Sequence, residues 1–117
     1  EQSKKQIEKL KKDGKKGYAA AMESTLRLTT LVDNLEKAPQ KADKAAVEKE
    51  LSEIEALLKS INNDRGQVLA DRYNSVVGDV RQVLADPSDN NLNNMIEGFN
   101  GYIDTYNSTT PDQFDAK

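Results

Sequence analysis

A chain of 117 residues has the length of a single domain, and this one contains no histidine, cysteine or tryptophan. The missing cysteine excludes disulfide frameworks, thiolate nucleophiles and cysteine-based zinc sites. The missing histidine removes the commonest general base and the usual di-metal site of helical proteins. Apolar residues make up 36% of the chain and charged residues 32%. Such a chain folds when its apolar residues gather on one face of each helix.

The net charge of −3 is unevenly distributed along the sequence. Residues 1–16 hold seven lysines against three acidic residues, a local charge of +4, whereas residues 86–117 hold six acidic residues against Lys117, a local charge of −5. The basic end is either a solvated tail or a stem near an anionic membrane surface, where each lysine gains about 1 kcal/mol. No aromatic residue interleaves with its lysines and the pI is near 5.0, so we expect no nucleic-acid binding.

The first apolar stripe has small residues in its middle. Positions 7, 10, 14, 17, 21, 24, 28, 31 and 35 keep helical spacing, but they include Gly14, Gly17, Ala21 and Ser24. Either one long helix packs closely against a neighbour there, or a helix begins near Gly17 after a frayed stem. Two glycines cost a helix roughly 2 kcal/mol. We therefore favour a helix over residues 18–37 and a basic, partly ordered N-terminal extension over residues 1–16.

Three further stripes follow in chain order, each at steps of three and four residues. Asp43 is the expected cap of the second helix, Asp64 of the third, and Ser88 or Asp89 of the fourth. Asn62-Asn63 ends the second helix and Asp86-Pro87 the third. The expected core positions are Val47, Leu51, Ile54, Leu58 and Ile61, then Leu69, Tyr73, Val76, Val80 and Val83, then Leu92, Ile96, Phe99, Ile103 and Tyr106.

Helices of nearly equal length joined by short turns favour an all-α fold. We predict an antiparallel up-down four-helix bundle over residues 17–108, with a stem over residues 1–16 and a C-terminal tail over residues 109–117. A three-helix bundle with a detached first helix is the alternative. Glutamates 48, 50, 53 and 55 crowd the second helix, and we interpret them as its charged flank. We expect no enzyme activity, cofactor or metal site.

The fourth helix combines asparagine with aromatic residues. Asparagine is a poor helix former, and tyrosine is enriched at protein interfaces. Phe99 and Tyr106 would suffice for the apolar stripe, which would leave Tyr102 exposed at its edge. Asn94, Tyr102 and Tyr106 are therefore the predicted partner-binding residues.

The composition favours a protein that acts by contact. We expect a non-enzymatic helical-bundle domain of the bacterial cell envelope or exterior that binds a protein partner. A start at Glu1 instead of Met, the missing cysteine and the basic stem favour this location, with a lipoprotein anchor upstream and the stem close to the membrane. The alternative is a cytoplasmic adaptor or an immunity-type inhibitor whose acidic face blocks a basic partner.

Overall fold

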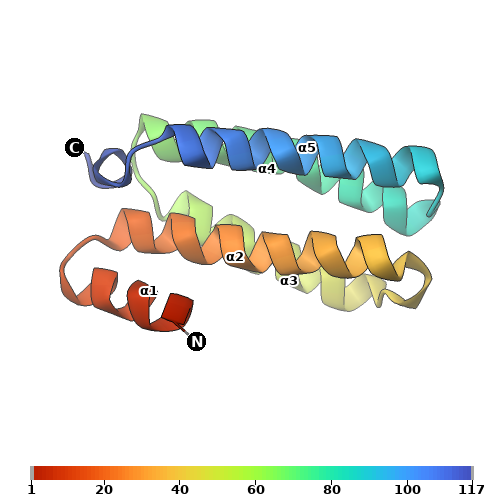
Figure 1. Cartoon of the computed structure of the whole chain (residues 1–117), viewed down its shortest axis with the longest axis horizontal. Coiled ribbons are helices and arrows are strands. Elements are labelled where there is room, and N and C mark those ends of the chain that lie inside the picture. Colours follow the sequence, from red (N-terminus) through yellow and green to blue (C-terminus); the bar gives the residue numbers. More distant parts are fainter. Residues whose placement is uncertain (1, 117) are drawn as a thin grey trace.

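The computed structural model describes residues 2–116, and the side chains of residues 4–116, as a set of packed helices. Helices α2 to α5 run back and forth along the 43 Å length of the molecule, and α1 lies outside them against α2 (Figure 1). The all-α prediction is confirmed, but the described residues form five α-helices where four were expected. The elements are α1 Gln2–Lys12, α2 Lys16–Lys37, the 3₁₀-helix η1 Pro39–Lys41, α3 Lys44–Lys59, α4 Asp64–Ala85, α5 Asp89–Ser108 and the 3₁₀-helix η2 Pro111–Asp115.

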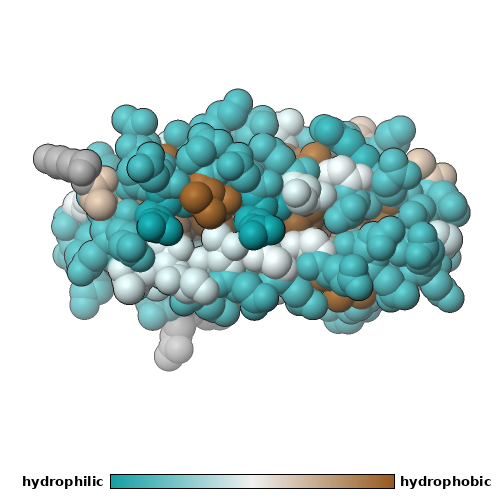
Figure 2. All heavy atoms as spheres, turned by 90° about the horizontal axis from the view of Figure 1, so that it is seen from above, coloured by the Kyte–Doolittle hydropathy of each residue, from teal (hydrophilic) through white to brown (hydrophobic). Residues whose placement is uncertain are grey.

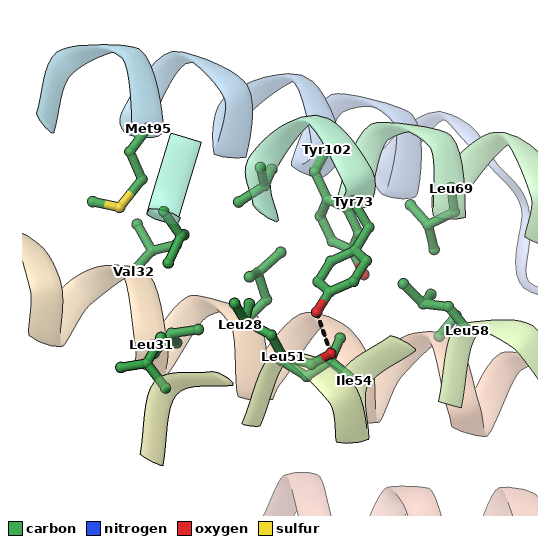
Figure 3. Close-up of a cluster of buried hydrophobic side chains, with 14 of the residues drawn as sticks. Leu28, Leu31, Val32, Leu51, Ile54, Leu58, Leu69, Tyr73, Met95 and Tyr102 are labelled. Atoms are coloured by element: carbon green, nitrogen blue, oxygen red, sulfur yellow. Dashed lines mark hydrogen bonds between the residues drawn. The ribbon is translucent and has the colours of Figure 1, made fainter. Parts of the chain in front are cut away.

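The apolar stripes of α2, α3 and α4 meet in one core, as their spacing predicts (Figure 3). Every expected core position of α3 and α4 is buried, as are Ile61, which follows the end of α3 at Lys59, and Leu28, Leu31 and Leu35 of α2. Tyr73 lies fully inside this core, and its hydroxyl donates a hydrogen bond to the Leu51 carbonyl oxygen at 2.5 Å. This bond joins α4 to α3 and satisfies the polar end of a buried ring.

Helix α5 is rotated by about one residue from its expected orientation. Its two fully buried side chains are Met95 and Tyr102, and the predicted core residues Ile96 and Ile103 lie half-buried beside them. Both sets have helical spacing, so the period alone does not choose between them. The residues of α5 that pack on the core are Leu92, Met95, Phe99, Tyr102, Ile103 and Tyr106, so four of the five predicted positions are confirmed and Ile96 is the exception.

The N-terminal segment is a helix that folds back along α2. Gly14 has a φ of +82°, in the left-handed region that favours glycine, and it ends the turn after α1. Ile7 is buried against α2, and Lys11 pairs with Glu23 at 3.6 Å. The favoured start of the first predicted bundle helix near Gly17 is confirmed, since this helix, α2, begins at Lys16. The alternative of one continuous helix is wrong.

In three of the helices the N-cap residue itself provides the side-chain cap. Asp43 caps α3 and Ser88 caps α5, as predicted. The cap of α4 is Asn63, whose Oδ1 accepts the Gly66 amide at 3.0 Å, and not the predicted Asp64. The prediction was wrong by one residue because Asn and Asp cap helices about equally well.

The C-terminal residues are docked on the helices and do not form a solvated tail. Phe114 of η2 is 2% exposed and lies between the rings of Tyr18 and Tyr106, with centroid distances of 6.2 and 6.0 Å. The Asp115 carboxylate accepts the amides of Gly17 at 2.6 Å and Tyr18 at 3.1 Å. It thus caps α2, whose own N-cap residue Lys15 makes no side-chain cap.

Asn63 holds the same segment from the other side. Its Nδ2 donates to the carbonyl oxygens of Gln113, Phe114 and Ala116 at 3.2, 2.9 and 3.1 Å, while its Oδ1 caps α4. One side chain therefore serves two elements, and η2 closes the end of the molecule where α2 and α4 begin (Figure 1).

Candidate functional site

The three residues predicted to bind a partner do not share one surface. Asn94 is exposed, Tyr106 is half-buried with its ring against Phe114, and Tyr102 is 0% exposed. The prediction that Tyr102 lies exposed at the edge of the stripe is wrong. Its hydroxyl hydrogen-bonds to Thr25 Oγ1 of α2 at 3.0 Å, and burial raises the pKa of Tyr102 to about 12. A polar partner on α2 lets this tyrosine serve as a core residue.

The outward face of α5 carries a continuous row of amides and carboxylates. We call it the amide–carboxylate strip; its members are exposed and, apart from the adjacent Asn93 and Asn94, follow one another at steps of three and four residues. Seen from the side of α4 and α5, the surface is mostly hydrophilic with small apolar patches (Figure 2). The strip consists of Asn93, Asn94, Glu97, Asn100, Asp104 and Asn107.

The asparagines of the strip differ from others in the chain that stabilise the fold. Asn91, at the start of α5, donates to the carbonyl oxygens of Gln82 and Asp86 at 3.3 and 2.8 Å. Asn63 caps α4. Within the described residues, the side chains of the strip asparagines form no hydrogen bond. They therefore present free amides to solvent.

The strip belongs to a region without positive charge. Residues 82–116 contain six acidic residues and no lysine or arginine. Glu97 and Asp104 form no ion pair with any residue that the structure describes. Beside the strip, burial and the nearby Glu97 raise the pKa of Asp79 on α4 above its ordinary value. This side of the molecule therefore has a surplus of negative charge.

The glutamates of α3 are engaged by arginines. The Arg27 guanidinium contacts Glu50 at 2.5 Å and Glu53 at 2.6 Å, and Arg81 contacts Glu48 at 2.9 Å. These hydrogen bonds raise the pKa of Arg27 and lower the pKa values of Glu48 and Glu53. A general acid needs a raised pKa, so this arrangement suits ion pairing between helices.

A groove lies between α1 and α2 on the other side of the molecule. Its volume is about 450 Å³. Ile7 and Leu26 provide its apolar wall, and Leu26 is 39% exposed. The other lining residues are Lys4, Glu8, Lys11, Glu23 and Arg27. The groove thus combines an apolar wall with a charged rim.

Residues 2–116 bring together no group of three acidic side chains that could hold a metal ion. No described helix combines the length and hydrophobicity needed to cross a bilayer. No known protein family, curated protein or solved structure matches the chain significantly. The residues define an all-helical protein with an acidic, amide-rich face on one side and a lysine-rich helix on the other.

Sequence reasoning missed three residues that shape these surfaces. Met95 was detectable, because it stands one heptad before Tyr102. Asp115 and Asn63 act across 98 and about 50 residues of sequence, respectively. No local pattern marks such contacts.

Proposed function

We propose that this protein acts without catalysis, by binding a protein partner through the amide–carboxylate strip of α5. In this proposal α2 to α5 form an antiparallel up-down four-helix bundle that holds the strip rigid, and α1 is an added helix. The observation that supports this proposal is the row of exposed asparagines whose side chains form no hydrogen bond within the described residues.

Those asparagines are unfavourable for the fold. Each one in a helix costs about 0.6 kcal/mol relative to alanine, so four of them cost roughly 2 kcal/mol. No hydrogen bond within the described residues offsets this cost. Residues that lower the stability of the fold and make no stabilising contact in it are typical of functional surfaces.

The chemistry of the strip indicates the kind of partner. Glu97 and Asp104 are one heptad apart, which separates them by about 10 Å along the helix. Asn100 between them and the asparagines on either side can donate and accept hydrogen bonds, as in the polar, hydrated interfaces of transient complexes. A partner with lysine or arginine side chains at similar spacing fits best.

We also propose that the protein works in the bacterial cell envelope or exterior, a location that the lysine-rich helix α1 favours. The cation-free strip also favours a second candidate, a cytoplasmic adaptor or immunity-type inhibitor that covers a basic surface of its partner. Fractionation of native cells distinguishes the two locations.

Paired asparagine substitutions test the proposed function. Asn94→Ala with Asn100→Ala changes the strip, and Asn34→Ala with Asn74→Ala changes exposed asparagines on α2 and α4. Both variants should be as stable as the unaltered protein or more so, because alanine favours helices. Only the strip variant should lose its captured partner from native extract, by about tenfold or more. Equal capture by all three proteins, measured by quantitative mass spectrometry, would refute the role of the strip.

A further inference from the structure

We propose that the α1 side of the molecule adsorbs to an anionic lipid bilayer, with α1 lying flat on the surface. The observation that supports this proposal is a row of lysines on α1 that form no ion pair with described residues. These lysines lie beside the partly apolar groove between α1 and α2. The proposal concerns a different face from the strip and does not depend on the proposed function.

The lysines of this face remain available to an external partner. Residues 4–16 hold seven lysines against Glu8 and Asp13. Lys11 pairs with Glu23 and Lys15 with Asp112, both at 3.6 Å. The remaining five are exposed and form no ion pair with any described residue. Lys4, Lys5, Lys9 and Lys12 lie on α1, and Lys16 begins α2.

The shape of this face suits a plane. Among the described elements, α1 packs against α2 alone, so its outer side is uncovered along its whole length. It lies parallel to the long axis of the molecule (Figure 1), and its 11 residues extend about 16 Å. A basic helix in this position can rest on lipid headgroups while the lysine stems contact the acyl boundary.

The groove adds an apolar contact. Leu26 lines the groove with 39% of its surface exposed, and Lys4 and Lys11 line the same groove. Ile7 is already buried against α2, so adsorption leaves α1 in place. We therefore infer a shallow association driven mainly by charge.

The acidic strip does not oppose this association. Helices α1 and α5 lie on opposite sides of the molecule (Figure 1), across a dimension of 26 Å. At physiological salt the Debye length is about 8 Å, so about three screening lengths separate the strip from the bilayer. The lysines dominate the interaction although the net charge is −3.

A bilayer fits this face better than a nucleic acid. Residues 1–17 contain no aromatic residue on which a base could stack. Leu26 also contributes to a lipid contact but has no counterpart in a phosphate backbone. The experiment must therefore distinguish binding to a bilayer from binding to a nucleic acid.

Co-sedimentation of the full chain with phosphatidylglycerol–phosphatidylcholine vesicles tests the proposal. One variant replaces Lys5, Lys9 and Lys12 with glutamine. A control variant of equal net charge replaces the exposed Lys41, Lys44 and Lys49 with glutamine. Each lysine near the surface strengthens binding about fivefold. The α1 variant should therefore bind about 100-fold more weakly, while the control stays within about threefold of the unaltered protein. Phosphatidylcholine vesicles alone should capture none of the three.

Two further measurements keep the result interpretable. Binding of the unaltered protein should fall steeply between about 0.05 and 0.5 M salt, and this needs no variant to fold. Leu26→Ser should weaken vesicle binding about threefold and leave binding to a DNA duplex unchanged. The proposal is overturned if the two lysine variants bind equally, if binding does not depend on salt, or if the unaltered protein prefers the duplex to the vesicles.

Discussion

The docking of the C-terminal segment makes a sharp prediction for Gly17→Ala. A Cβ at this position would lie 2.1 Å from the Phe114 carbonyl oxygen and 2.8 Å from Asp115 Oδ1. The nearest obstacle is backbone and cannot rotate away. The substitution should therefore displace η2 from the start of α2, although alanine is otherwise the better helix residue.

The contacts of η2 set the magnitude. Losing the burial of a phenylalanine costs about 3–5 kcal/mol, and losing a helix cap costs about 1 kcal/mol. Alanine returns at most about 1 kcal/mol of helix preference, and η2 can keep part of its contacts by shifting. We expect Gly17→Ala to lower the free energy of unfolding by about 2–4 kcal/mol, measured by urea titration.

A second chain, truncated after Thr110, provides the control. Without η2 the added methyl group meets none of the η2 atoms, so the sign should reverse and Gly17→Ala should stabilise by up to about 1 kcal/mol. A stabilising osmolyte keeps the truncated chain folded during the titration. An equal loss of stability in both chains would show that the cost arises elsewhere, and would refute the reasoning.

Two more predictions concern a carboxylate and a helix contact. Asp79→Asn should raise the thermal midpoint at neutral pH, because burial and Glu97 raise the folded-state pKa of Asp79 and so make its ionised form unfavourable to folding. The gain should shrink as the pH falls through that pKa, and a gain that grows at low pH would contradict this sign. Ile7→Asp should undock α1, which packs only on α2. Amide exchange should show lost protection in residues 4–12 and little change in α4 and α5, and fast exchange throughout would show that α1 is integral to the core.

The sequence was sufficient for the part of the core in which one face of each helix is clearly apolar. In α3 the predicted set, such as Leu51 with Leu58, is buried. In α4 two adjacent sets fit the period, and the predicted one, Val76 with Val83, is fully buried while Val77 and Leu84 pack beside it. In such cases the pattern of apolar and polar residues and its helical period together identify the buried face of the helix.

The prediction was less accurate for α5, where the adjacent apolar pairs contain Met95 and Tyr102, which were not assigned to the core. Met95 precedes Ile96, and Tyr102 precedes Ile103, so two faces one residue apart fit equally well. The hydroxyl of Thr25 on α2 provides a buried partner for Tyr102. Only the three-dimensional arrangement shows this bond, and this is why Tyr102 was predicted to be exposed although it is buried, while Asn94 lies on the surface as expected.

The two ends of the chain were predicted as unpacked because their contacts are distant in sequence. Phe114 looked like one apolar residue in a polar tail, yet it fills a space between Tyr18 and Tyr106. Gly17 looked like a helix breaker, yet its missing side chain makes room for the η2 backbone. A single residue can thus follow a long-range packing need that opposes its local preference.

Two neighbouring hydroxyls on α2 should respond oppositely to removal. Ser24 is 0% exposed and its Oγ has no hydrogen-bond partner within the described residues, whereas Thr25 Oγ1 donates to the Ala21 carbonyl oxygen at 2.8 Å and contacts Tyr102. Ser24→Ala should therefore stabilise the protein by about 1 kcal/mol, because it removes an unsatisfied polar group. Thr25→Val keeps the shape of the side chain but leaves the Tyr102 hydroxyl unpaired, and should destabilise by about 1–3 kcal/mol. Urea titrations of the two variants measure both values. A loss of stability in both would mean that Ser24 has a partner, such as a buried water molecule, and that the polar layer between α2 and α5 is larger than these contacts indicate.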